Sequence, residues 1–332
     1  MPINDWTDDR LTRLGDASGV PFDTAKEISQ RTDDAGLRFI IPGDPEWPAK
    51  LDDLVGVRFD MRPTEPPVGL WVTGPGNLAE WTNNAIAMVG SRAATRYGES
   101  VAMSFAQDLA SGRNTFDPDG PPLAARTIMS GGAFGIDAAS HRGALQSGGR
   151  TIAVAAGGLD INYPPGNSGL LDLIREKGLM VSEYPPGMAP QRPQFLERNR
   201  LIAALSDGVV VVEAALRSGA RNTASWAHAI GRPIMAVPGP VTSAMSVTPH
   251  RLIQDGRASL VTTPADVEAT IAAFKQRGRG WDTPAANLAA QANAQPTMQA
   301  ATSGFEVGRY LADAQGTPFM PPPITQTPRL GL

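Results

Sequence analysis

The chain has no cysteine among its 332 residues. This absence excludes disulfide bonds, thiolate metal ligands and a cysteine nucleophile. Histidine is scarce as well, since His141, His228 and His250 are the only three. A metal site is therefore not expected, and no residue pattern calls for a bound cofactor.

Long apolar runs are also missing. No stretch approaches the roughly 20 apolar residues of a membrane-spanning helix, and the N-terminus, MPINDWTDDR, is acidic where a signal peptide is basic and then apolar. The hydrophobic content of 42% is enough to build a core. We expect a soluble, cytoplasmic protein that does not associate with membranes.

Positive charge is too limited overall for indiscriminate nucleic-acid binding, because the net charge is −4. The balance changes along the chain, however. The first 60 residues hold 13 acids and 7 bases, whereas the segment from Arg192 to Arg232 holds six arginines, no lysine and three acids. Arginine without lysine favours planar, bidentate or stacking contacts.

Apolar runs alternate with helix-length segments from about residue 85 onward. Continuous apolar runs of this kind are typical of buried parallel strands, and their alternation with helices predicts a doubly wound, Rossmann-like, mostly parallel α/β sheet. The expected strands lie at 86–90, 126–130, 151–156, 178–183, 208–213, 233–237 and 259–262.

Three regions are predicted from these patterns. Residues 1–40 form a small helical extension, with Asp8 and Asp9 in a first turn and Leu11 and Leu14 on the apolar side. Residues 41–275 form the sheet domain. Residues 276–332 are biased toward Pro, Ala and Gln, which predicts a disordered tail.

Two expected strands end in turns suited to phosphate. They carry the sequences IAMVGSRAATRYGES (86–100) and TIMSGGAFGIDAASHRGAL (127–145). Gly131, Gly132 and Gly135 let the backbone approach an anion closely, and the amides at a helix start supply donors. Tight packing of strand against helix, without any ligand, remains an alternative explanation.

A third segment, SEYPPGMAPQRPQFLERNR (182–200), places arginines at the same edge of the sheet. Arg198 and Arg200 are two positions apart, so on one helix they point in different directions. We expect one of them to reach phosphate and the other to pair with a carboxylate such as Glu213. The alternative is a proline-stiffened surface loop with solvated arginines.

Asp137 and His141 are separated by four residues at the start of the second expected helix. This spacing resembles an acid-base pair, although a hydrogen bond on the helix surface explains it more simply. Asp137 near a helix N-terminus repels phosphate. We therefore expect it to organise the glycine turn.

Seven motifs occur together in this chain in a fixed order: MVGSRAATRYGE, SGGAFGIDAASHRGAL, GGLDINYPPGN, SEYPPG, FLERNRLIAALSDGVVVVEA, SGARNTA and AVPGP. Over about residues 44–268 they resemble the DNA-processing protein DprA (Smf) family. The resemblance implies an extended Rossmann-like domain that binds single-stranded DNA as a dimer and delivers it to a RecA-type recombinase, without established catalysis.

The resemblance also implies which residues line the DNA groove. They fall in four segments: Ser91, Arg92 and Thr95; Gly131, Gly132 and Gly135; Arg198, Asn199 and Arg200; Ser218, Gly219 and Thr223.

Two positions depart from the family pattern. Phe134 stands where an arginine is usual, and an aromatic ring there can stack on a base. Arg221 replaces a residue that is usually apolar, so a cation lost at one rim segment reappears at a neighbouring one.

Two other functions stay open. One is a nucleotide hydrolase of the related lysine-decarboxylase-like or phosphoribohydrolase type, with Glu213 as its acid. Its PGG-x-GT turn with a following glutamate is absent, and SGARNTASWA occupies that place. The other is a small-ligand sensor or structural partner whose tail recruits another molecule.

Overall fold

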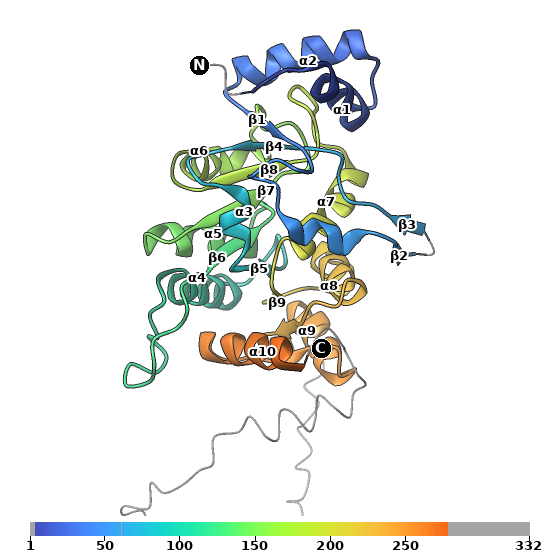
Figure 1. The fold of residues 1–332 in the computed structure, drawn as a ribbon. Helices are drawn as coiled ribbons and strands as arrows, with labels where there is room; N and C mark the ends of the chain where they lie inside the picture. Colours follow the sequence, from blue (N-terminus) through green and yellow to red (C-terminus); the bar gives the residue numbers. More distant parts are fainter. Residues whose placement is uncertain (1–3, 61, 278–332) are drawn as a thin grey trace, which may run out of the picture. The chain divides into compact units, whose positions relative to one another are not determined.

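The computed structural model describes residues 4–60 and 62–277 of the chain. Within this part, the main element is a nine-stranded sheet (Figure 1). Its strands, in spatial order, are β1 (Arg38–Ile40), β4 (Leu70–Thr73), β8 (Leu179–Ser182), β7 (Thr151–Val154), β6 (Thr127–Ser130), β5 (Ala85–Val89), β9 (Val209–Val211), β10 (Ile234–Ala236) and β11 (Ser259–Leu260).

The strands from β8 to β11 in this spatial order are all parallel. At the other edge of this sheet, β4 pairs antiparallel with β8, and β1 pairs antiparallel with β4. The predicted fold class is confirmed, and each of the seven predicted strands is present. Six of them are one to three residues shorter than predicted, and β5 is shifted by one residue toward the N-terminus. Differences of this size between predicted and observed strand ends are normal where an apolar run continues into a turn.

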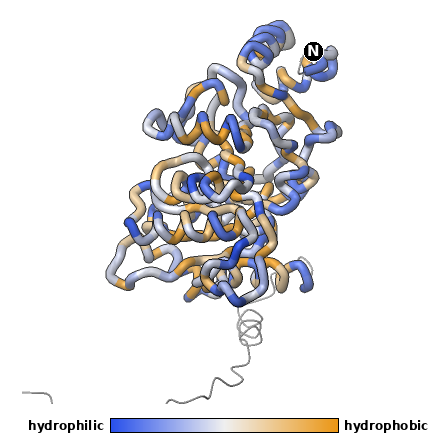
Figure 2. The backbone as a smooth tube through the Cα atoms, turned by 90° about the vertical axis from the view of Figure 1, so that its left-hand side faces the viewer, coloured by the Kyte–Doolittle hydropathy of each residue, from blue (hydrophilic) through white to orange (hydrophobic). Residues whose placement is uncertain are grey.

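Helices cover both faces of the sheet, and Figure 2 shows the hydrophobic residues concentrated between them. The first face carries α3 (Leu78–Thr82), α7 (Arg192–Ala204), α8 (Gly219–Ala229) and α9 (Val247–Gln254). The second carries α4 (Arg96–Ser111), α5 (Ile136–Gln146), α6 (Ser168–Lys177) and α10 (Pro264–Arg277).

Strand β5 shows why the apolar runs are continuous. Ala85, Ala87 and Val89 pack into the core under the first face, while Ile86 and Met88 pack into the core under the second. Successive side chains of a strand point to opposite sides. A strand covered by helices on both sides is therefore mostly apolar, and a polar residue such as Thr151 of β7 occurs there with hydrogen-bond partners.

The N-terminal helices are α1 (Asp8–Ser18) and α2 (Phe22–Asp34), which confirms the helical prediction for this region. Thr7 caps α1 by accepting a hydrogen bond from the Arg10 amide, and Gly19 ends it at a left-handed φ of 67°. Leu14 is fully buried. The division into regions 1–40 and 41–275 stays a prediction.

The segment before β4 contains the short 3₁₀ helix η1 (Ala49–Leu54) and a hairpin of β2 (Val57–Phe59) and β3 (Arg62–Thr64). The sequence did not predict this hairpin, because prolines interrupt its alternation. Phe59 stacks on Trp226 of α8 with ring centroids 3.7 Å apart.

Of the predicted tail, residues 276 and 277 end α10 and the rest lies outside the described residues. Among the helices of the described part, none combines the length and apolar character needed to cross a membrane.

Candidate nucleic-acid interface

The strand order reverses at β5, because β6, β7 and β8 follow on one side of it and β9, β10 and β11 on the other. Ligands of doubly wound sheets bind at such a point, outside the carboxyl ends of the strands. The loops at this edge include those from β5 to α4, β6 to α5, β7 to α6, β8 to α7 and β9 to α8. They contain most of the predicted site residues.

The turn between β5 and α4 is held by Glu213, which follows β9. The Ser91 amide donates to the Glu213 backbone carbonyl at 2.6 Å. The Glu213 carboxylate accepts from the Thr95 amide at 2.8 Å and from the Thr95 hydroxyl at 2.7 Å. Gly98 is needed here, because a Cβ at that position would overlap the carboxylate. The N-terminus of α4 therefore already holds an internal anion.

Glu213 is only 1% exposed. The expectation that it pairs with an arginine of the RNR segment is wrong. Arg200 instead pairs with Glu183 at 2.5 Å, since both lie on the β8 side of the sheet while Glu213 lies beyond β5. Both oxygens of this buried carboxylate are bonded to Thr95, so the contacts that it makes hold the turn in place.

The glycine turn between β6 and α5 is organised by Asp137, as predicted. Its carboxylate accepts from the amides of Gly131 at 3.2 Å and Ala133 at 3.3 Å. Gly132 and Gly135 adopt φ values of 69° and 70°, the left-handed region that favours glycine. A Cβ on Gly135 would overlap the Ser91 carbonyl, so the two turns touch here.

Three amides of this turn donate no hydrogen bond within the described part of the chain, those of Gly132, Phe134 and Gly135. Gly132 is buried, whereas Phe134 is exposed and Gly135 is half-buried. The amides of Phe134 and Gly135 follow one another, and successive free amides of this kind form an anion-binding concavity. The turn therefore has donors to offer to a phosphate.

Arg198 lies beneath this turn and is 5% exposed. Its Nη1 donates to the carbonyls of Gly131, at 2.9 Å, and Val154. Burial lowers the pKa of Arg198 to about 10, against the opposing effect of Asp137, so the guanidinium stays charged at neutral pH. Burial raises the pKa of Asp137, and Arg198 opposes that shift. Through these two hydrogen bonds, the buried side chain of Arg198 links the carboxyl ends of β6 and β7.

His141 is fully buried, so the expectation of a hydrogen bond on the helix surface is wrong. Its Nδ1 lies 2.7 Å from the Thr151 hydroxyl, which itself donates to the Ile128 carbonyl. Nδ1 must therefore carry the proton and donate. Burial, followed by the charges of Arg198 and Arg142, lowers the pKa of His141 to about 3. The ring is a neutral part of the core.

The rest of the RNR segment also supports neighbouring elements. Arg198 and Arg200 point in different directions along α7, as their spacing predicts. The Asn199 amide group donates to the Gly219 carbonyl at 3.4 Å and to the Asn222 side chain at 3.1 Å. Asn199 therefore fixes the start of α8.

The turn between β9 and α8 has both exposed and buried predicted residues. The Ser218 hydroxyl caps α8 by accepting from the Ala220 amide at 3.3 Å. Gly219 and Arg221 are exposed, as is Arg217, whereas Thr223 is 2% exposed. Arg217 and Arg221 are the cationic side chains that this region presents to solvent, beside the exposed Leu216.

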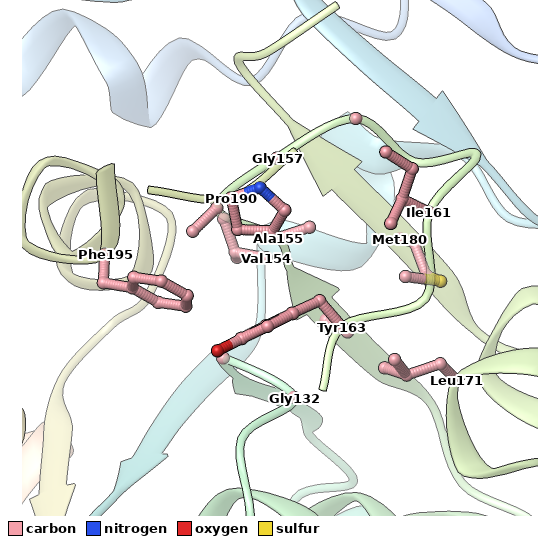
Figure 3. Close-up of a pocket in the computed structure, with 14 residues that line it drawn as sticks. Gly132, Val154, Ala155, Gly157, Ile161, Tyr163, Leu171, Met180, Pro190 and Phe195 are labelled. Atoms are coloured by element: carbon pink, nitrogen blue, oxygen red, sulfur yellow. The ribbon is translucent and has the colours of Figure 1, made fainter. Parts of the chain in front are cut away.

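A recess opens beside the glycine turn, at the ends of β6 and β7 (Figure 3). Its cavity volume is about 20 Å³, roughly the space of one water molecule. Tyr163 and Phe195 line it, with ring centroids 5.5 Å apart, and Leu171 and Met180 lie on its opposite side.

Two more side chains extend this aromatic group. The Arg92 guanidinium lies 5.0 Å from the centroid of Phe195, and Phe134 packs beside Gly166 in the loop that carries Tyr163. Phe134 and Tyr163 are each 43% exposed. We call Phe134, Tyr163 and Phe195 the aromatic platform.

The sequence did not single out Tyr163 or Phe195. Both follow strand ends, in NYPP after β7 and in QRPQFLERNR after β8. An aromatic residue beyond each of three neighbouring parallel strands is the signal that predicts such a platform, since these strand ends share one edge.

The comparisons with known proteins agree with this fold. The family model of DNA recombination-mediator protein A matches residues 38–272. A DNA processing protein DprA of Mycobacterium tuberculosis is 46% identical over 269 residues, which cover 78% of this chain and 66% of that protein. The chain thus spans slightly less than two thirds of this relative's length.

Two solved structures are also similar. DNA processing protein A from Streptococcus pneumoniae is 35% identical, with a TM-score of 0.59 over 74% of this chain and 81% of that one. The protein from Helicobacter pylori, described by its single-stranded DNA binding mode, is 24% identical, with a TM-score of 0.57 over 73% of this chain and 98% of that one. At that identity the second supports the fold alone. By the match of its sheet domain, this chain is a member of the DNA recombination-mediator protein A family.

Proposed function

We propose that this chain binds single-stranded DNA at the carboxyl edge of its sheet. The open amides of Phe134 and Gly135, together with Arg92, hold phosphates there. The exposed rings of Phe134 and Tyr163 stack on bases, while Phe195 supports Tyr163 and Arg92. The observation that carries the proposal is this platform of rings beside unpaired amides.

The size of the recess supports a strand read without sequence preference. The recess holds about one water molecule, so the proposal places bases on the exposed rings and not inside a pocket. Stacking accepts every base, because each has a π face. A related protein from Helicobacter pylori is described as binding single-stranded DNA.

The proposal assigns different roles to the predicted site residues. Arg92, Thr95, Gly219 and Arg221 are exposed and can meet the strand. Arg198, Asn199 and Thr223 are buried, and their role is to hold the turns in place.

Binding takes place without catalysis in this proposal. The rival nucleotide hydrolase would use Glu213 as its acid, and that carboxylate is buried against Thr95. Delivery of the strand to a RecA-type recombinase, a homodimer and a cytoplasmic location belong to the same proposal, as expected from the family.

The test is a salt series of binding to oligothymidine beside an assay for nucleotide hydrolysis. We expect affinity to fall linearly with salt on logarithmic axes, with a slope of about −0.7 for each phosphate contacted, and no hydrolysis. Measurable hydrolysis that is lost in Glu213→Gln, without oligothymidine binding, would support the rival.

A further inference from the structure

The GGLDINYPPGN motif forms the loop between β7 and α6 that carries Tyr163. The proposed function uses only the tyrosine of this motif, and other polar residues of the motif anchor the loop. The Asp160 carboxylate accepts from the Gly187 amide, in the loop after β8, with both oxygens at 2.9 Å. The Asn162 side chain donates to Asp172 of α6 at 2.9 Å. The loop is therefore tied to the elements on either side of it.

Asn167, the last residue of the motif, links this loop to the glycine turn. Its Nδ2 donates to the Gly132 carbonyl at 3.0 Å, across 35 positions of the chain. Its own backbone amide donates to the carbonyl of Pro164, the residue after Tyr163, at 2.9 Å. Asn167 is 3% exposed, and hydrogen bonds are stronger in such a buried, low-dielectric place. One buried residue therefore connects the backbone beside the Tyr163 ring with the turn that offers amides to phosphate.

The place of Asn167 in the chain shows that its side chain serves the turn. Asn167 is the N-cap residue of α6. An asparagine at an N-cap usually accepts a hydrogen bond from an amide in the first turn of its helix. The Asn167 side chain makes no such capping bond and donates to Gly132 instead. The contact with the glycine turn thus takes the place of a local contact that would stabilise the helix.

Packing joins the same two segments. A Cβ built on Gly166 would lie 2.9 Å from Cζ of Phe134, so the Phe134 ring lies against the backbone next to Asn167. Figure 3 shows Gly132 and Tyr163 on the wall of the same recess. The hydrogen bond and this contact together hold the exposed rings and the open amides at one spacing.

We propose that Asn167 is a positioning residue for DNA binding. It sets the spacing between the Tyr163 ring, which stacks on a base, and the open amides of the glycine turn, which hold a phosphate. The proposal rests on the proposed function. Base and phosphate are joined covalently in the strand, so both contacts form together only where the protein presents ring and amides at a matching distance. A spacing that is set before DNA binds spares the free energy of ordering the loop.

The test replaces Asn167 by leucine, which has a similar size and cannot donate. Asp137 still holds the glycine turn in this variant, so the phosphate contacts and the salt slope should stay those of wild type. The displaced Tyr163 ring should no longer stack. Affinity for oligothymidine should therefore fall by about 5-fold to about 150-fold, the range for the loss of one stacked base. Asn167→Ala, whose side chain is smaller and adds no bulk, should give the same result.

Two measurements separate this positioning role from a purely structural one. The first uses oligothymidine with one thymidine replaced by 2-aminopurine, whose fluorescence falls when the base stacks. Wild-type protein should quench this fluorescence at saturation, and Asn167→Leu should lose the quenching. The second combines substitutions. Tyr163→Leu should weaken binding strongly in the wild-type background but by less than about twofold in the Asn167→Leu background, because residues that act together are not additive.

Asn4→Leu is the matched control. Asn4 is also a buried asparagine, 7% exposed, and its Nδ2 donates to the carbonyl of a distant residue, Leu37, at 3.0 Å. It belongs to the N-terminal region and not to the loop of Tyr163. Asn4→Leu should lower the melting temperature, while its folded fraction should bind and quench as wild type does.

The outcomes distinguish the proposal from its alternatives. Wild-type affinity and quenching in the folded fraction of Asn167→Leu and Asn167→Ala would overturn it, and so would an equal effect of Tyr163→Leu in both backgrounds. A smaller salt slope with full quenching would also overturn it, because Asn167 would then act on phosphate contact alone. Wild-type protein that binds no oligothymidine would instead contradict the proposed function itself. Circular dichroism and thermal melting give the folded fraction of each variant.

Discussion

Replacing Arg198 by methionine removes a buried guanidinium while keeping a side chain of similar length. Two carbonyls, of Gly131 and Val154, lose their donor, and the buried carboxylate of Asp137 loses the cation that opposes its raised pKa. Breaking one side of a buried charge arrangement costs about 3–5 kcal/mol. At about 2–4 °C per kcal/mol for a domain of this size, the melting temperature should fall by on the order of 10 °C.

The DNA assay separates this positioning role from direct phosphate contact. Arg198 lies beneath the turn, so Arg198→Met should weaken oligothymidine binding by misplacing the open amides while leaving the salt slope of the folded fraction nearly unchanged. Arg92→Gln is the comparison, because Arg92 is exposed. It should leave thermal stability nearly unchanged and reduce the magnitude of the slope by about 0.7.

The melting temperature and the salt slope together distinguish a positioning role of Arg198 from direct contact with phosphate. Thermal melting gives the stability loss, and binding at three or more salt concentrations gives the slope. Arg198→Met with a wild-type melting temperature and a slope reduced as much as that of Arg92→Gln would refute the positioning role and make Arg198 a phosphate ligand.

Three further predictions follow from the same geometry. Gly135→Ala should abolish DNA binding, because the added Cβ overlaps a backbone carbonyl. The control Gly148→Ala has a similar φ of 71° and nothing within 4 Å of the added Cβ, so it should lose only about 1 kcal/mol of stability and bind DNA normally. Equal DNA binding by the two variants would contradict the role of the turn. Phe134→Leu and Tyr163→Leu should each weaken oligothymidine binding by about 1–3 kcal/mol without altering the salt slope, and a change in slope alone would argue against stacking. Burial lowers the pKa of His141 to about 3, so its contribution to stability is fully present above pH 6.5 and is lost as pH falls toward 3. The unfolding free energies of wild type and His141→Gln, measured by denaturant melts, should converge over that range by up to about 1.4 kcal/mol per pH unit. A difference that stays constant with pH would contradict this prediction.

Much of the fold was predictable because its signals are local. A strand such as β9, between two layers of helices, must be apolar at every position, so the sequence alone reveals it. Gly132 and Gly135 predict a turn for a similarly local reason, because few other residues adopt their positive φ values. The hairpin of β2 and β3 was not predicted because prolines such as Pro63 interrupt its alternation. Only the folded structure shows that Phe59 of this hairpin stacks on Trp226 of α8.

The site was less predictable, because its partners come from separate strands. Helical spacing established that Arg198 and Arg200 diverge, but not which one turns inward. That choice depends on where α7 crosses the end of β7, which brings Arg198 under the Gly131 carbonyl. For the same reason Glu213 was matched to the wrong group: strand order places it beside Thr95 and away from the arginines.

By itself, then, the sequence determined the alternation of strands and helices, the glycine turn and the surplus of arginine at one edge. Each of these follows from residues close together in the chain. The tertiary structure alone decided that Tyr163 and Phe195 meet beside the open amides of that turn. It also decided that Arg198 turns under the Gly131 carbonyl while Arg200 pairs with Glu183, because only the order of strands in the sheet brings distant loops together.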